Sequence, residues 1–147
     1  MKKIRPIAVC VFSNNGRILV AELQDRVSKE VFYRPLGGGI EFMETGEEAI
    51  QREIHEELHE EIENVKLLGY LENLFHHEGE PGHEIVIVFD GSFKNKALYE
   101  KSRLEGMEDN GDKIKAVWKD VSDFSENGCV LYPNAILELL NKSEKVK

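Results

Sequence analysis

The stretch from Gly37 to Glu63 limits what this chain can fold into more than any other part of the sequence. Three consecutive glycines, which allow positive φ and close approach to a ligand, lead into a run of carboxylates. This run holds ten of the protein's 28 acidic residues, and Arg52 is the only Lys or Arg among them. Thr45 is a good N-cap, and Glu48 completes a capping-box pattern. The sequence therefore predicts a helix that begins directly after a glycine-rich turn.

The predicted helix has two different faces. One is an apolar stripe that recurs every fourth residue: Ile50, Ile54 and Leu58. On a neighbouring face, Glu53, Glu56 and Glu57 come together, because each residue advances a helix by about 100°. Like charges at this spacing destabilise an isolated helix by roughly 0.2–0.5 kcal/mol per pair. We therefore expect the apolar stripe to pack on a sheet and the carboxylates to bind a divalent cation.

The remaining composition fits a single domain over residues 1–147, with 41% hydrophobic and 32% charged residues. A formal net charge of −9 argues against DNA and anionic membranes as partners. No stretch approaches the roughly 20 apolar residues of a membrane span. Cys10 and Cys129 show no metal-ligand spacing, and Cys10 lies in an apolar run typical of a core. We expect a reduced, cytoplasmic protein.

Strands are predicted on both sides of this helix. Apolar or β-branched runs place them at residues 4–12, 17–23, 31–33, 65–75, 84–93 and 114–118. Asn15-Gly16 is a hairpin signal, whereas residues 76–82 and 94–113 are polar and predict a loop and a surface excursion. A second helix is expected to start near Pro133. Interleaved strands and helices predict an α/β (α+β) domain with a mixed sheet.

The spacing of the charged residues in the central stretch resembles the Nudix box, G-x5-E-x7-R-E-U-x-E-E-x-G-U, where U is a bulky aliphatic residue. The matching positions are Gly38, Glu44, Arg52, Glu53, Glu56 and Glu57. Two positions depart from the pattern: His59 replaces a glycine, and Glu60 replaces an aliphatic residue. A left-handed residue at the helix end suits glycine better than histidine, so the two departures leave the geometry of the helix exit open.

The resemblance implies a Nudix-like α/β/α sandwich and hydrolysis of a nucleoside diphosphate linked to another group X. It implies that Glu53, Glu56 and Glu57 bind Mg²⁺ or Mn²⁺ and take part in catalysis, with a backbone carbonyl near Gly38 as a further ligand. The remaining two matched residues have a supporting role in this family: Glu44 pairs with Arg52. The implied partner is a small nucleotide-type diphosphate, and a homodimer is compatible with the family.

The general base stays open between a glutamate of the box and one from a later loop. Glu57 is the first candidate. The candidates outside the box are Glu84, Glu105 and Glu108, although glutamates in such positions are more often solvated surface acids.

Substrate contacts are less specific in the sequence. Arg34 and Arg5 are candidates to bind phosphate from the sheet edge, with an ordinary surface role as the alternative. Glu84 and Glu108 are also candidates to contact the substrate. Aromatic candidates to stack on a base are Tyr33, Phe75 and Trp118, although single aromatics in strand patterns usually belong to the core.

A second metal-binding pattern overlaps the first. Residues 55–59 read H-E-x-x-H, as in zinc metallopeptidases. His55 and His59 lie far around the helix from Glu53 and Glu57, so one helix cannot point both sets into the same site. A further alternative is a Nudix-fold nucleotide-binding module without turnover, but such modules usually lose a box glutamate, and here all are present.

The motif does not select a substrate. Nucleoside triphosphates, ADP-ribose, dinucleoside polyphosphates, nucleotide sugars and capped RNA ends all contain the bond that the box would address. We expect the segments at 76–83 and 94–113 to choose among them.

Overall fold

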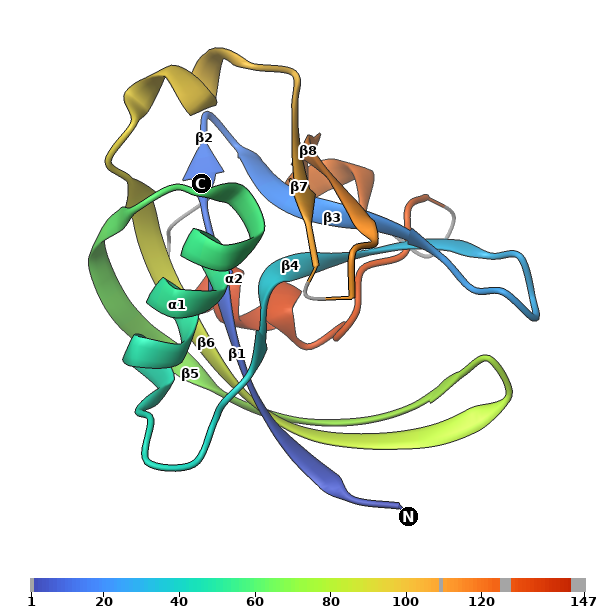
Figure 1. The fold of residues 1–147 in the computed structure, drawn as a ribbon. Helices are drawn as coiled ribbons and strands as arrows, with labels where there is room; N and C mark the ends of the chain where they lie inside the picture. Colours follow the sequence, from blue (N-terminus) through green and yellow to red (C-terminus); the bar gives the residue numbers. More distant parts are fainter. Residues whose placement is uncertain (1, 109, 125–127, 144–147) are drawn as a thin grey trace.

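The computed structural model of the chain describes residues 2–108, 110–124 and 128–143 (Figure 1). Strand β1 (Ile4–Val11) is an inner strand that pairs parallel with β6 (Glu80–Phe93) and antiparallel with β4 (Val31–Gly39). The strand order is β5-β6-β1-β4-β3-β8-β7, and β2 pairs with β3. The other strands are β2 (Ser13–Asn14), β3 (Arg17–Gln24), β5 (Ile62–His77), β7 (Arg103–Met107) and β8 (Lys113–Asp120). The sheet is therefore mixed, as the sequence predicts.

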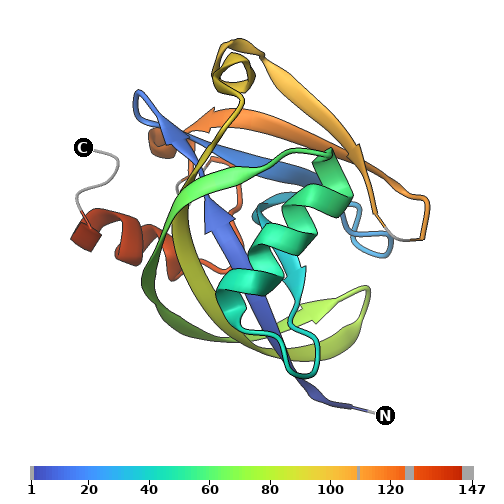
Figure 2. The ribbon, with the colours of Figure 1, turned by 60° about the vertical axis from the view of Figure 1, so that its left-hand side comes forward.

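Two helices cover the two faces of β1 (Figure 2). Ala8 and Cys10 join the core cluster that contains the apolar side of α1 (Gly46–Leu58). Their neighbours Ile7 and Val9 join a second cluster with the buried residues of α2 (Ile136–Ser143). Successive side chains of a strand point to opposite faces, so one apolar strand is sufficient to hold both layers. The predicted sandwich is confirmed.

Helix α1 begins and ends through specific backbone contacts. The Thr45 hydroxyl accepts from the Glu48 N–H at 3.1 Å, and the Glu48 carboxylate accepts from the Thr45 N–H at 3.0 Å. At the other end His59 adopts a left-handed conformation (φ 57°), and its N–H donates to the His55 carbonyl. Histidine thus occupies the position that favours glycine, and the helix exit keeps its usual geometry.

Three segments are more regular than their composition suggests. Strand β4 continues beyond Tyr33 through Pro35 and the glycines, because β3 pairs with its first half and β1 with its second. The expected loop at 76–82 is the tip of a hairpin in which β5 and β6 stay paired up to His77 and Glu80. The expected excursion at 94–113 contains a 3₁₀ helix, η1 (Lys96–Glu100), and strand β7. These predictions were wrong because pairing with a partner strand outweighs weak local strand propensity.

The C-terminal helix starts three residues after Pro133, at Ile136, and a short 3₁₀ helix, η2 (Val121–Asp123), follows β8. Within the described part of the chain, neither α-helix nor 3₁₀ helix is long and apolar enough to cross a membrane.

The glycines of β4 are required by neighbouring protein atoms. Gly37 has φ +154°, and a Cβ there would lie 2.0 Å from the Ala8 carbonyl oxygen of β1. A Cβ at Gly38 would lie 2.5–2.7 Å from the Glu53 carboxylate. Gly39 has more space, since the nearest atom is the end of the Arg5 side chain at 3.6 Å. The close approach at the first two glycines is therefore made by β1 and α1.

We expect Gly37→Ala to lower the free energy of unfolding by at least about 2 kcal/mol, because the methyl group would force β4 away from β1 in an unfavourable backbone conformation. Gly39→Ala is the matched control and should change stability much less. Urea unfolding of the two variants checks this, and equal losses would contradict the proposed close contact.

Candidate active site

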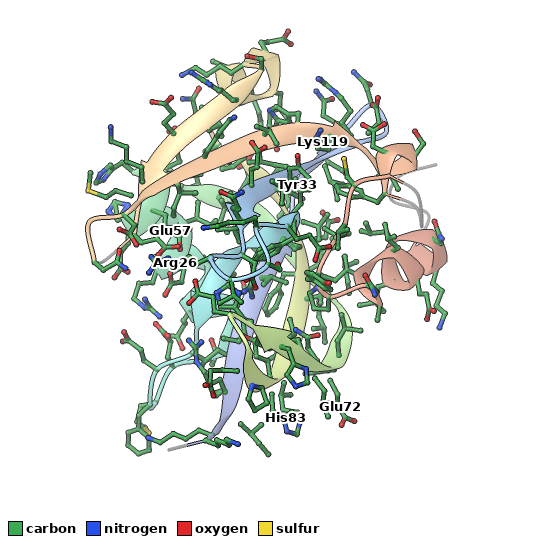
Figure 3. The ribbon with its side chains drawn as sticks, turned by 90° about the vertical axis from the view of Figure 1, so that its right-hand side faces the viewer. Arg26, Tyr33, Glu57, Glu72, His83 and Lys119 are labelled. Carbon is green, nitrogen blue, oxygen red and sulfur yellow. The ribbon has the colours of Figure 1, made fainter. Side chains whose placement is uncertain are left out.

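A cleft of about 1070 Å³ opens beside the C-terminal part of α1. Glu57 of α1 and Gly38 of β4 lie on its wall together with Glu84 of β6. Two arginines, Arg5 of β1 and Arg34 of β4, line it as well. Figure 3 views the molecule from this side and labels Glu57 and Arg26. Arg26 lies in the turn between β3 and β4, and both residues line the cleft. The fold thus collects carboxylates and guanidinium groups from four elements in one concave site.

Glu57 is held on the buried side of α1. Its exposed fraction is 8%, although its neighbour Glu56 is exposed. Strand β7 packs closely here, because a Cβ at Gly106 would lie 2.3 Å from the Glu57 carbonyl oxygen. The glycine of β7 therefore allows this strand to close over the end of the helix that carries Glu57.

Arg52 connects the glutamates of the central stretch. It forms a two-pronged ion pair with Glu44, with Nε to Oε2 at 2.7 Å and Nη2 to Oε1 at 2.9 Å. Its Nη2 also donates to the Gly39 carbonyl at 3.0 Å. Nη1 donates to Glu53 at 2.9 Å and to Glu56 at 3.3 Å. One guanidinium thus fixes the loop before α1 and lies between two of the carboxylates that the sequence assigns to metal binding.

These contacts change the acidity of the pair. The hydrogen bonds from Arg52, followed by that from the Glu41 N–H, hold the pKa of Glu44 at about 2, well below its ordinary 4.5. The carboxylate of Glu44 in turn raises the pKa of Arg52 above its usual range. Both groups are charged at any pH where the protein would act.

The glutamates fit a divalent cation in their chemistry. Carboxylate oxygens are the ligands that Mg²⁺ and Mn²⁺ prefer, and the Glu53 carboxylate lies against the backbone of Gly38. Among the residues that the structure describes, however, no three His, Cys, Asp or Glu side chains are grouped closely enough to hold a metal. Glu53 and Glu56 accept from Arg52, whereas Glu57 lines the cleft. The carboxylates that could coordinate a metal are therefore present, and the positive charge beside Glu53 and Glu56 is that of Arg52.

The structure separates the candidate bases outside the box. Glu108 lines the cleft, whereas Glu105 lines a smaller hollow of about 390 Å³ with Leu58 and Glu60. Glu84 is not a solvated acid, since its exposed fraction is 2%. It is buried because β6 is an inner strand, where Arg34 lies 3.7 Å from its Oε1 and the Asn73 amide donates to that oxygen at 3.3 Å.

Of the three aromatic candidates, only Phe75 lies on the cleft, with its ring over Gly82. Tyr33 and Trp118 belong to the two core clusters, which agrees with the alternative that single aromatics in strands are part of the core. Two cleft aromatics were missed, Phe32 and Tyr132. The alternation of β4 could have indicated Phe32, because it shares a strand face with Arg34.

The histidines of the overlapping zinc pattern point elsewhere. His55 and His59 are exposed, their ring centroids are 6.4 Å apart, and neither is among the residues that line the cleft.

Comparison with known proteins identifies the family and the fold. The family model of the NUDIX domain matches residues 2–133. A MutT NUDIX hydrolase from Burkholderia pseudomallei has a similar crystal structure, with a TM-score of 0.67 and 22% sequence identity over 95% of this chain and 99% of that one. A NUDIX hydrolase from Nitrosomonas europaea superimposes with a TM-score of 0.68 at 15% identity, covering 97% of this chain and 90% of the other. At these identities the two structures establish the shared fold.

The Glu44–Arg52 pair should make stability depend on acidity. Because the pKa of Glu44 is lower in the folded chain than in the unfolded one, its contribution is complete above about pH 4.5 and is lost as the pH falls towards 2. We expect Glu44→Gln to melt below the wild type at pH 7 and the difference to shrink at pH 2.5. Thermal unfolding at both values measures this, with Glu100→Gln, at an exposed position of η1 remote in sequence from this pair, as the control. A difference that does not change with pH would contradict this role.

Proposed function

Because the chain belongs to the Nudix family, we propose that it is a hydrolase that cleaves the diphosphate bond of a nucleoside diphosphate linked to another group. The products would be a nucleoside monophosphate and the phosphorylated second group.

One observation carries the proposal. A single cleft contains the helix carboxylate of Glu57 and the guanidinium groups of Arg5 and Arg34. Guanidinium groups bind phosphate oxygens through paired hydrogen bonds, whereas a carboxylate can accept a proton from water. A site built for an uncharged or cationic substrate would have no need of the two arginines.

The proposal includes Mg²⁺ or Mn²⁺ as the cofactor. Glu53, Glu56 and Glu57, with the backbone at Gly38, would hold it. When bound, such an ion neutralises charge on the diphosphate and lowers the pKa of a coordinated water. The contacts of Glu53 and Glu56 with Arg52 would orient these two carboxylates before the ion arrives.

The protein's own groups then have separate roles. Glu57 is the proposed general base, which takes a proton from the water that attacks phosphorus while the bond to the bridging oxygen breaks. Arg34 and Arg5 bind the phosphate oxygens, and buried Glu84 positions Arg34 from 3.7 Å. Glu44 keeps Arg52 and the preceding loop fixed. Glu108, at the edge of the cleft, is a substrate contact in this proposal.

A small, anionic nucleotide is the proposed partner. The net charge of −9 supports neither DNA nor an anionic membrane as a ligand. Two cysteines far apart in sequence, without a secreted disulfide framework, support a cytoplasmic location.

Replacing Glu57 tests its role. We expect Glu57→Gln to reduce turnover by at least about 100-fold, because the amide cannot accept the proton, while the melting temperature stays close to that of the wild type. Exposed Glu47 of the same helix provides the control variant Glu47→Gln, which should keep full activity. Phosphate-bond cleavage would be assayed with a panel of nucleoside triphosphates, ADP-ribose, nucleotide sugars and dinucleoside polyphosphates. Near-normal turnover of Glu57→Gln would remove this residue from the mechanism.

Metal exchange separates the proposed chemistry from that of a zinc peptidase. Protein stripped with a chelator should lose turnover, regain it with Mg²⁺ or Mn²⁺, and melt at a higher temperature when Mn²⁺ is added. Restoration by Zn²⁺ alone would overturn the proposal in favour of the histidine pattern. Nucleotide-induced stabilisation without cleavage of any panel member would instead indicate a binding module.

A further inference from the structure

The end of the cleft remote from α1 is aromatic. Phe32 of β4 makes edge-to-face contacts with His77 of β5, at 6.0 Å between ring centroids, and with Tyr132, at 5.6 Å. All three line the cleft that contains Glu57. Phe32 is half-buried, whereas Tyr132 is 36% exposed. These rings come from three segments far apart in the sequence, and each keeps part of its surface open to the cleft.

Strand β4 determines the order in which aromatic, cationic and acidic groups follow one another along this cleft. Tyr33 and Leu36 belong to opposite core clusters, so alternation places Phe32 and Arg34 on the face that also presents Gly38 to α1. At the rise of a strand, Phe32 lies roughly 7 Å from Arg34 and roughly 20 Å from Gly38. A guanidinium group therefore stands between the aromatic end and the carboxylate end, at a distance that a sugar can bridge.

The aromatic end is held together by Asp25 in the turn between β3 and β4. One oxygen of Asp25 accepts from the Glu78 N–H at the β5–β6 tip at 2.9 Å, and the His77 Nδ1 lies 3.5 Å from the same oxygen. The other accepts from the N–H groups of Val27 and Ser28, both at 2.9 Å. The two hairpin tips lie side by side in Figures 1 and 2. Asp25 thus joins the two hairpin tips next to the contact between Phe32 and His77.

The charged residues at the aromatic end indicate which part of a nucleotide could bind there. Asp25, Glu30 and Glu78 line it, with Arg26 as the nearby cation that pairs with Glu78 at 3.4 Å. The hydrogen bond from Glu78, followed by that from Ser28, lowers the pKa of Asp25 to about 2, so it is a carboxylate at neutral pH. A phosphate group is disfavoured among these acids, whereas a planar, uncharged ring with N–H donors is well suited to them.

We infer that Phe32, Tyr132 and His77 form the binding site for the nucleobase of the substrate, with its phosphates extending along β4 towards Arg34 and Glu57. The inference rests on the proposed function and adds the orientation of the substrate. Phe32 and Tyr132 determine specificity, because they contact the base and are remote from the bond that breaks.

Binding measurements test this site separately from turnover. Calorimetric titration of the full chain would compare ADP, GDP, CDP and UDP with inorganic pyrophosphate, which has no base. Phe32→Leu and Tyr132→Leu, which keep apolar volume, should each weaken the tightest nucleoside diphosphate by on the order of 10- to 100-fold. Pyrophosphate affinity should not change. In turnover assays, the same variants should raise KM with little effect on kcat.

The matched controls are exposed aromatics that do not line the cleft: Phe42→Leu and Tyr70→Leu. They should bind like the wild type. Nucleotide affinity within twofold of the wild type in both cleft variants would overturn the inference. So would an equal loss of pyrophosphate affinity, or a wild type that binds no nucleoside diphosphate more tightly than pyrophosphate. Circular dichroism verifies that each variant is folded.

The two proposals can fail separately. Turnover that requires Glu57 but is insensitive to Phe32 and Tyr132 would leave the hydrolase proposal standing without the base site. Base-dependent binding in a protein that cleaves no phosphate bond would support the base site and contradict the hydrolase proposal.

Discussion

The pairing of Arg52 with Glu44 is the interaction on which the site depends. A helix that places several glutamates together is unfavourable by itself, and the loop before it has to be held against the helix. Arg52 solves both problems because its guanidinium binds Glu44, the Gly39 carbonyl and two helix carboxylates at once. The end of β4 and the start of α1 are thereby joined into one rigid corner, against which the cleft is formed.

The features that the sequence predicted correctly are those determined by residues close together in the chain. The capping box, the apolar stripe of α1 and the buried β1 each depend on neighbours within a few residues. The length of the β5–β6 hairpin and strand β7 depend on backbone pairing across turns whose polar composition does not indicate a strand. The burial of Glu84 depends on the pairing of β6 with β1, which is distant in sequence and which a single chain read locally does not contain. The cleft rings Phe32 and Tyr132 were missed for the same reason, since they become neighbours only after folding.

This difference explains why the chemical class could be inferred from a motif and the substrate could not. The motif occupies one helix and the strand end before it, and these two elements carry Glu57 and Gly38. The opposite end of the cleft is built from the β3–β4 turn, the β5–β6 tip and the segment at Tyr132. Those parts can change without altering the spacing of the box, so the proposed base site and the proposed site of bond cleavage are structurally separable.

Strand β5 has a consequence for how copies of the protein meet. It is an edge strand of 16 residues, and edges of that length are templates for pairing with another chain. Its register with β6 shifts twice, between Glu63 and Lys66 and between Leu67 and Gly69. Such bulges twist an edge and interrupt its row of backbone donors and acceptors. Half of the strand is therefore protected against the edge-to-edge association that leads to aggregates, and regular pairing geometry is confined to residues 69–77, nearest the hairpin tip.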